Sequence, residues 1–551
     1  MNRRGIHGIG LVPPVMMGGN FDEAYLLRDD FTDTLPAGSV NGTLAVPGPG
    51  NRVVVDTGFN VSTLLGRIKC VAYVQNGNPF LTYTPTITRA AGRLAVFSAF
   101  DEWGAGRFSA GFWDLANPLV PTNALGAWVD FAGLIGCASN GANDFSGNLV
   151  SIIGSADTPL AVGLRASGAF YWHKTGGNWH LDFISSVGST ATLYVGWGMR
   201  LSSLASLNYI RVPVTLWLPA PLASDSFNRA DGAIGMTDGA GHAEANGGTN
   251  LPWTGGAIAG NALAISPSTV GGDLIVNGTF TGWTADNPDG WSYSTEDANT
   301  KVTQNPAGKC EIISNIGTYF FIAQAGLLDP TKWYTGTIDV DTVAAGSLTS
   351  TYLPSMVAIL STTGSGKPYS GRAVGSAFDI KRVGITDVTI DNVSVYKLST
   401  SSLFSSLIVS TVNILIDCEV SVRNAGTQCG LVARLDSDAT PANFIIAYFY
   451  GDGTVKVDEC VAGVYTQLLS AVQAFTASDH LVLDLNGTAW RLYHRTAAGV
   501  TTLLGNGATN VVTGNLAGGF STYAANRINS FVVWAKGVEN QYSILDKWSK
   551  P

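Results

Sequence analysis

Hydrophobic and polar residues of this chain alternate in short runs rather than along amphipathic helices. Almost no window of about 12 residues keeps an apolar face at i, i+3, i+4 and i+7 without an intervening Gly or Pro. Short β-branched and aromatic runs recur instead between turn pairs such as N-G, D-G and G-G. This pattern predicts an all-β, multi-domain protein of antiparallel β-sandwiches. Even the best helix candidate, residues 464–475, is expected not to be helical.

The chain contains an internal repeat. Two openings resemble each other, DDF at residues 29–31 and DSF at residues 225–227, and each leads into a stretch rich in Gly. Two endings also resemble each other, IRVPVTLW at residues 210–217 and INSFVVW at residues 528–534. The first ending lies 186 positions after the Phe of its opening and the second 307. The second unit is therefore too long by about 120 residues.

The surplus lies in residues 272–399, which open with DLIVNGTFTGW and close with VTIDNVSVY. Surface loops accept insertions at little cost, so we expect a third β domain here. Because an inserted domain must return its ends close together, residues 274–276 and 393–396 should lie side by side. The predicted organisation is an extended arm (1–27), a first sandwich (28–220), a second sandwich (223–268 with 402–538), the insert (272–399) and a C-terminal tail (539–551).

Two family resemblances follow from these segments. The opening DSFNRADGAIGMTDGAGHAEANGG resembles the start of concanavalin A-like (laminin G-like) sandwiches, which recur in phage tail and bacterial surface proteins. The resemblance covers residues 225–266 and 402–537 well and residues 28–219 more faintly. Through LIVNGTF…GW and TIDNVSVY, the insert resembles carbohydrate-binding modules of families 4 and 9. The resemblance implies concanavalin-like sandwiches carrying an inserted jelly roll.

The second resemblance also implies a structural calcium ion. Such modules commonly hold calcium between their first and last strands, which corresponds here to Asp391 with backbone oxygens near Asn277. Thr281 stands where those modules usually have an acidic residue. Despite this difference, Asp391 and Asn277 are the candidate calcium ligands that the resemblance implies. No other cofactor is expected.

Aromatic residues are the best candidates for ligand contact. Sugars stack their apolar C–H faces on flat rings while their hydroxyl groups bond to nearby Asn, Asp and Arg. The insert places rings and polar residues together in this way. The candidate carbohydrate-binding residues are Trp283, Trp291, Tyr293, Trp333 and Tyr334.

Other chemistries find little support in the sequence. The net charge of −9 and the absence of a basic face argue against a nucleic-acid partner. No apolar run reaches the ~20 residues needed to cross a membrane, and the six cysteines form no C-x-x-C pair. Asp417 and Glu419 share one side of a strand, which we interpret as a solvated face, and His173 and His180 should meet across a hairpin as a surface contact. We expect no catalytic residues.

The resemblances, together with the lack of an export signal and the low charge, favour a structural protein of a tailed-phage virion surface. It would be a tail fibre, spike or head decoration protein, made in the host cytoplasm, whose lectin-like domains attach to host-surface glycans. The arm would bind other virion proteins, and the chain would form a homo-oligomer, with a trimer favoured. The alternatives are a polysaccharide depolymerase (glycoside hydrolase) with an accessory sugar module, and a purely structural spacer.

Overall fold

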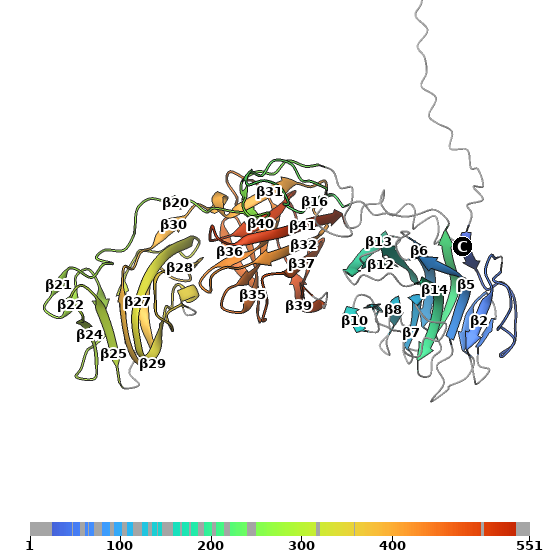
Figure 1. Ribbon diagram of the computed structural model, residues 1–551, viewed down its shortest axis with the longest axis horizontal. Coiled ribbons are helices and arrows are strands. Elements are labelled where there is room, and N and C mark those ends of the chain that lie inside the picture. The colour runs from blue at the N-terminus through green and yellow to red at the C-terminus, as the bar shows by residue number, and fades with distance from the viewer. Residues whose placement is uncertain are drawn as a thin grey trace, which may run out of the picture.

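The fold consists of three β lobes in a row, with the second sandwich in the middle (Figure 1). The computed structural model describes residues 25–213 apart from most loops of that segment, 221–239, and 250–535 apart from 316–319, 357–358 and 498–500. Within some strands of the first segment only the backbone is described. The sheets are antiparallel throughout these residues, which confirms the all-β prediction. No helix among them is long and apolar enough to cross a membrane.

The first sandwich is built from residues 25–213. One sheet has the order β13-β12-β11-β6-β15-β4-β3, with β1 on β15, and the other has the order β10-β9-β8-β7-β14-β5-β2. The strands are β1 (Tyr25–Asp29), β2 (Arg52–Val55), β3 (Val61–Thr63), β4 (Ile68–Cys70), β5 (Phe80–Thr88), β6 (Leu94–Asp101), β7 (Arg107–Trp113), β8 (Ala124–Val129), β9 (Ile135–Ser139), β10 (Ala142–Phe145), β11 (Thr158–Arg165), β12 (Gly168–Thr175), β13 (Asn178–Ser185), β14 (Thr192–Arg200) and β15 (Ala205–Pro213).

The second sandwich joins two separate stretches of chain. One sheet has the order β17-β18-β19-β41-β32-β37-β38-β39, with β16 on β41, and the other has the order β31-β40-β33-β34-β35-β36. The strands are β16 (Ala223–Asp225), β17 (Gly232–Ala233), β18 (Ala257–Ile258), β19 (Leu263–Ala264), β31 (Phe404–Ile408), β32 (Ile414–Ser421), β33 (Gln428–Leu435), β34 (Phe444–Tyr450), β35 (Thr454–Val461), β36 (Val464–Val472), β37 (Asp479–Asn486), β38 (Ala489–Arg495), β39 (Thr501–Ala508), β40 (Leu516–Ser521) and β41 (Arg527–Ala535).

The two sandwiches share one strand order. The series β13-β12-β11-β6-β15 corresponds to β39-β38-β37-β32-β41, and β10-β9-β8-β7-β14-β5 corresponds to β36-β35-β34-β33-β40-β31. In both, the first strand pairs with the last, β1 with β15 and β16 with β41. This equivalence agrees with the paired openings and endings of the sequence.

Each opening forms the same corner at the end of its first strand. Phe31 and Phe227 have positive φ angles of 48° and 52°, a conformation uncommon for residues other than glycine. The corner is held by the aspartate two residues before each Phe. Phe31 N donates to Asp29 Oδ1 (3.1 Å), and Phe227 N donates to Asp225 Oδ1 (2.8 Å). The carboxylate thus fixes the turn that feeds each Phe into its core.

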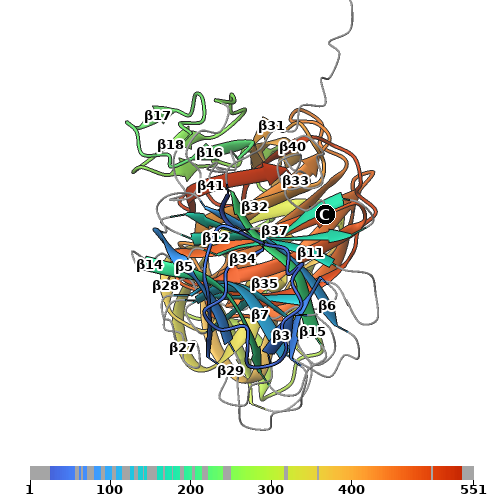
Figure 2. The same cartoon turned by 90° about the vertical axis from the view of Figure 1, so that its right-hand side faces the viewer.

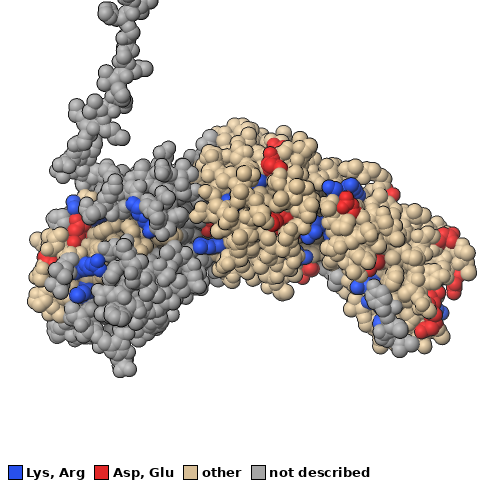
Figure 3. Space-filling view, turned by 180° about the vertical axis from the view of Figure 1, so that it is seen from behind, with Lys and Arg blue, Asp and Glu red and all other residues tan. Residues whose placement is uncertain are grey.

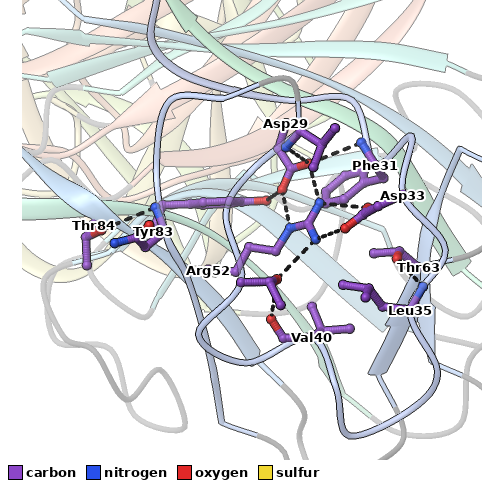
Figure 4. Close-up of polar contacts among 12 residues, drawn as sticks. Asp29, Phe31, Asp33, Leu35, Val40, Arg52, Thr63, Tyr83 and Thr84 are labelled. Carbon is purple, nitrogen blue, oxygen red and sulfur yellow. Dashed lines mark hydrogen bonds and ion pairs between the residues drawn. The ribbon is translucent and has the colours of Figure 1, made fainter.

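A buried arginine neutralises the first corner (Figure 4). Arg52 donates from Nε to Asp29 Oδ2 (2.6 Å) and from Nη2 to Asp29 Oδ1 (2.7 Å), and both side chains are wholly buried. Tyr83 also donates its hydroxyl to Asp29 Oδ2 (2.9 Å), and the outer nitrogen of Arg52 reaches Asp33. Because every charged group has an opposite partner, burial of this corner is tolerated.

In the second corner the arginine comes from the turn itself. Arg229, four residues after Asp225, donates from Nη1 to Oδ1 (2.6 Å) and from Nη2 to Oδ2 (2.9 Å), and Trp253 Nε1 adds a bond to Oδ2 (2.8 Å). Similar openings therefore fold alike with charge partners from different places in the sequence.

The insert forms the third lobe. Its main sheet has the order β20-β30-β27-β29-β25-β24, with β26 and β23 on β29 and β28 on β27, and β21 pairs with β22 separately. The strands are β20 (Thr269–Val270), β21 (Trp283–Thr284), β22 (Asn287–Pro288), β23 (Ser292–Tyr293), β24 (Thr300–Gln304), β25 (Cys310–Ser314), β26 (Phe321–Gln324), β27 (Trp333–Thr349), β28 (Gly364–Arg372), β29 (Phe378–Asp391) and β30 (Tyr396–Leu398), with 3-10 turns at Pro354–Met356 and Thr400–Leu403.

Local predictions can be compared with this fold. The ends of the insert do lie side by side, because Leu274 N donates to Val395 O (2.9 Å). The best helix candidate is strand β36, as expected. The predicted arm ends too late, since residues 25–27 already belong to β1 on the first sandwich. Residues 1–24 of that arm, and the tail 539–551, lie outside the described residues.

Candidate functional site

The five predicted sugar-binding rings do not share one environment. Trp291, Trp333 and Tyr334 are buried, with 6%, 2% and 2% of their surface exposed. Tyr293 is 43% exposed, and Trp283 is half-buried against the core of the insert. The burial corrects the expectation for the first three, because a ring enclosed by protein offers no face for a sugar. Only Trp283 and Tyr293 remain as candidates for a solvent-facing platform.

Two of the buried rings belong to the core of the insert. The centroid of Trp291 lies 5.5 Å from that of Phe280, and its Nε1 donates to Asn277 O (3.3 Å). The Tyr334 hydroxyl accepts a bond from Asp329 N (2.7 Å), and burial raises the pKa of Tyr334. The third ring, Trp333, lies where the insert meets the second sandwich, in contact with Tyr448 and Phe520.

The distal hairpin, residues 280–290, presents Trp283. Residues 283–284 pair with residues 287–288, and Ala285 between them has a φ of 58°. The Trp283 Nε1 group donates to Phe280 O (2.5 Å), so the indole is anchored through its nitrogen. β21 and β22 lie at the end of the molecule farthest from the first sandwich (Figure 1). The hairpin therefore holds a partly exposed ring at one tip of the protein.

Asn277 braces the distal hairpin. Its Oδ1 accepts from Gly282 N (3.0 Å), and its Nδ2 donates to the carbonyls of Gly282 (2.8 Å) and Asp289 (3.0 Å). All the polar atoms of the amide are thus used to hold the loop. Asn277 itself has a φ of 53°, which Asn tolerates better than most residues. This amide has a structural role that the sequence did not indicate.

Exposed polar groups accompany the ring on the distal hairpin. Asp286 and Asp289 are exposed, and Thr284 Oγ1 donates to Asp289 Oδ1 (2.6 Å). Asn287 Nδ2 donates to Asp286 Oδ1 (3.1 Å). Acidic side chains gather at this end of the insert in the space-filling view (Figure 3). The hairpin therefore offers carboxylate acceptors beside an aromatic surface.

The predicted calcium ligands do not form a cation cage. The side chain of Asn277 is used within its loop, Asn277 O accepts from Trp291 Nε1, and Gly278 O accepts from Val393 N (2.9 Å). Calcium needs six to eight oxygen ligands. The residues that the structure describes contain no group of three or more His, Cys, Asp or Glu able to hold a metal ion.

Asp391 itself faces an ion pair rather than a cage. Its Oδ1 accepts from Asn392 N (2.7 Å), and burial raises the pKa of Asp391 while the ammonium group of nearby Lys309 opposes that rise. Lys309 pairs with Asp341. A lysine thus supplies positive charge beside the carboxylate, and the donors do not fit calcium.

Asp417 and Glu419 form no solvated strand face, which corrects a second expectation. Asp417 is 2% exposed, and its two oxygens meet His480 Nδ1 (2.7 Å) and Arg495 Nη1 (2.5 Å). Glu419 Oε1 accepts from Asn529 Nδ2 (3.0 Å). Asp417 is therefore a buried, paired carboxylate, and Glu419 is half-buried.

The histidine hairpin is partly as predicted. His173 and His180 are direct partners across β12 and β13, which confirms their pairing. His173 is only 5% exposed, so its expected surface position is wrong. Cys310, Cys418, Cys429 and Cys460 are buried free thiols.

The fold and these surfaces define a multi-domain, antiparallel β-sandwich protein. No known family and no curated protein matches the chain by sequence. Among solved structures, it is similar to the carbohydrate-binding module CBM66 from Bacillus subtilis (15% identity, 24% of this chain and 79% of that chain, TM-score 0.19). It is also similar to the VIP36 exoplasmic/lumenal domain in metal-free form (8% identity, 33% and 92%, TM-score 0.26) and to a glycosyl hydrolase family protein from Mycobacterium fortuitum (14% identity, 34% and 99%, TM-score 0.24). Likeness at these TM-scores carries no argument about activity.

Proposed function

We propose that this protein binds glycans and that the distal hairpin of the insert makes the contact. The observation that carries the proposal is the partial exposure of Trp283 beside the exposed carboxylates of Asp286 and Asp289 at one tip of the molecule. The exposed ring of Tyr293, on β23, adds a second aromatic surface to the same lobe. Rings with adjacent acceptors match the alternating apolar and hydroxyl faces of a sugar.

The expected affinity of one such surface is low. A ring-face contact contributes on the order of 1 kcal/mol, by analogy with other aromatic contacts. Two rings and a few hydroxyl bonds therefore give weak binding by a single copy. Stable attachment to a surface polysaccharide would need many copies acting together.

A virion surface provides such a display. We propose that the chain is a structural protein of a tailed-phage virion, as a fibre, spike or decoration protein that attaches to host glycans. The resemblances of the two sandwiches and the insert support this role. Residues 1–24 would bind another virion protein, and a homo-oligomer, a trimer in a fibre or spike, would multiply the weak sites.

Calorimetry on the full chain tests glycan binding. A host-surface polysaccharide selected on a glycan array is titrated into the wild type and into Trp283→Ala and Tyr293→Ala. Each substitution should weaken binding by about fivefold, the equivalent of ~1 kcal/mol. The matched control is Tyr523→Ala, which removes a half-buried ring from the second sandwich and should leave binding unchanged.

The same samples test the two alternatives. Release of new reducing ends from the polysaccharide would favour a depolymerase over a binding protein. Equal affinity of the wild type and both insert variants would contradict the proposed site. No binding of any polysaccharide by the wild type would leave the structural spacer as the better account.

A further inference from the structure

The backbone around the distal hairpin is held in a conformation that needs support. Asn277, Phe280 and Ala285 have φ angles of 53°, 46° and 58°, in the left-handed region that residues other than glycine seldom adopt. Such residues persist only where the surrounding structure fixes them, and they gather at ligand-binding sites. The contacts that fix this hairpin therefore bear on what it presents to solvent.

One side-chain amide closes the base of the hairpin. Asn277 Nδ2 donates to Gly282 O (2.8 Å) and to Asp289 O (3.0 Å), and Asn277 Oδ1 accepts from Gly282 N (3.0 Å). Asp289 N also donates to Gly282 O (3.0 Å). Because Gly282 and Asp289 flank the paired residues 283–288, the amide clamps both ends of that segment at one point.

The segment that carries the amide is mounted on the core of the insert. Asn277 O accepts from Phe280 N (3.3 Å) and from Nε1 of the buried Trp291 (3.3 Å). The next residue, Gly278, accepts from Val393 N (2.9 Å), and a Cβ atom on Gly278 would lie 1.9 Å from Val393 O. The clamp therefore has a packed base.

Trp283 is fixed at both its backbone and its ring by this arrangement. Its backbone follows directly from Gly282, which the amide holds through both N and O. Its indole Nε1 donates to Phe280 O (2.5 Å), and Phe280 N is in turn bonded to Asn277 O. The ring therefore has its orientation before any ligand arrives.

This order matters because the expected sugar contact is weak. Ordering a loop on binding consumes part of the interaction free energy, and a preorganised loop avoids that loss. A ring-face contact that improves affinity about fivefold is small enough for such a loss to cancel it. A weak aromatic platform therefore depends on the contacts that hold it in place.

We propose that Asn277 is a positioning residue of the glycan site, which orders the distal hairpin so that Trp283 can stack on a sugar ring. The inference rests on the proposed glycan-binding function and adds a residue that itself contacts no sugar. The amide supplies donors and an acceptor at one point. An aspartate there has no donor when ionised and would turn a second oxygen toward the carbonyls of Gly282 and Asp289.

Calorimetry on full-length variants tests this role. Asn277→Gly removes the three amide bonds but accepts the left-handed backbone without strain, so it should weaken polysaccharide binding by about fivefold or more. Asn277→Asp should have the same effect, which keeps the test valid if one variant does not fold. The matched control is Asn392→Gly, because Asn392 has a φ of 49° in the same lobe but its Nδ2 donates to Asp339 Oδ2 (2.7 Å). Its affinity should equal that of the wild type.

A double variant separates positioning from a general loss of structure. Asn277→Gly and Trp283→Ala together should weaken binding by less than the product of their separate factors, because both act on the same ring. Full additivity, or unchanged affinity in folded Asn277→Gly, would overturn the positioning role alone. A wild type that binds no polysaccharide would contradict the proposed function, and the positioning role with it.

Fluorine NMR of the full chain labelled with fluorotryptophan observes the ring directly, without a ligand. The Trp283 resonance is the one that Trp283→Phe removes. It should broaden or shift in Asn277→Gly and stay unchanged in Asn392→Gly. An unchanged Trp283 resonance in Asn277→Gly would show that the amide does not hold the ring, and the proposal would then be wrong.

Discussion

At the scale of single residues, the sequence identified the corners but not their partners. The repeated Asp before Phe predicts two equivalent openings, and both form the same left-handed corner. The arginine partner of Asp29 comes from β2, whereas that of Asp225 lies four residues away. No local pattern could indicate Arg52, because its pairing depends on how a distant strand returns beside the corner.

The first corner should be a point of high sensitivity. Asp29→Ala leaves the wholly buried Arg52 guanidinium without its main partner, so unfolding of the first sandwich in urea should show a loss of about 3–5 kcal/mol. Arg28→Ala, which breaks the more exposed pair with Asp30, should cost no more than about 1 kcal/mol. Equal losses for the two variants would show that burial does not set the value of these pairs.

Asp479 should make stability dependent on acid pH. Burial tends to raise the pKa of Asp479, but hydrogen bonds from His494, Thr476 and Ala497 N outweigh it and hold the pKa below its usual value. The stabilisation is present above the unfolded pKa, about 3.9, and is lost as pH falls through the folded pKa. Denaturant midpoints from pH 6 to pH 2.5 should fall less steeply for Asp479→Asn than for the wild type.

Asp458 provides a control, because its pKa is shifted in the opposite direction to that of Asp479. Burial raises its pKa, so its carboxyl contributes stability below the unfolded pKa that is lost as pH rises through the folded pKa. Asp458→Asn should therefore reduce the stability lost on raising the pH from 3 to 7. The same direction of change for Asp479→Asn and Asp458→Asn would contradict these assignments.

At the scale of elements, one unbroken apolar run indicates burial on both faces of a strand as well as the strand itself. The run FIIAYFY is strand β34, buried at every position, as is β33 beside it. A strand buried on both faces reads as a continuous apolar run instead of an alternating one. Such a run is typical of a strand buried on both faces, but it does not indicate which segment covers the outer face, because that depends on where the insert docks.

The insert packs against the second sandwich through a shared hydrophobic core. Trp333 and Leu398 of the insert share a core with Phe404, Tyr448 and Phe520 of the second sandwich. Trp333→Ala in the full chain should lower the free energy of unfolding by about 3–5 kcal/mol, because it leaves a cavity in that core. Thermal denaturation followed by tyrosine fluorescence would measure it, and Trp283→Ala, at a half-buried ring, should cost less.

Deletion of the insert tests the same contact from the other side. A chain in which a short Gly-Ser linker replaces residues 271–397 should fold but expose the outer aromatic face of β34 and β40. It should bind a hydrophobic dye and aggregate more readily than the full chain. A monodisperse deletion variant that binds no dye would show that the contact between the insert and the second sandwich contributes little to stability. The insert would then be an independent appendage.

At the scale of the whole molecule, the lobes are joined by packed rings as well as by chain. Phe170 of the first sandwich meets Trp534 of the second at 6.1 Å between centroids, and Trp333 joins the insert to the second (Figure 2 shows the row end-on). The sequence indicated three units through its repeat and its surplus length. It could not indicate these junctions, because each uses residues that a single sandwich would also bury.

The N-terminal residues should matter for assembly and not for sugar binding. Deletion of residues 2–20 removes Pro13, Pro14 and two arginines, and particle incorporation should fall sharply if this segment anchors the chain. Glycan binding by the purified deletion variant should match that of the full chain. Normal incorporation would refute the anchoring role.

The position of a bound glycan tests the central claim most directly. The full chain is mixed with the oligosaccharide selected on the array, and its structure is determined by crystallography or electron microscopy. We predict a sugar ring stacked on Trp283 or Tyr293 with its hydroxyl groups bonded to Asp286 or Asp289. A bound oligosaccharide that touches none of these four residues would contradict the account.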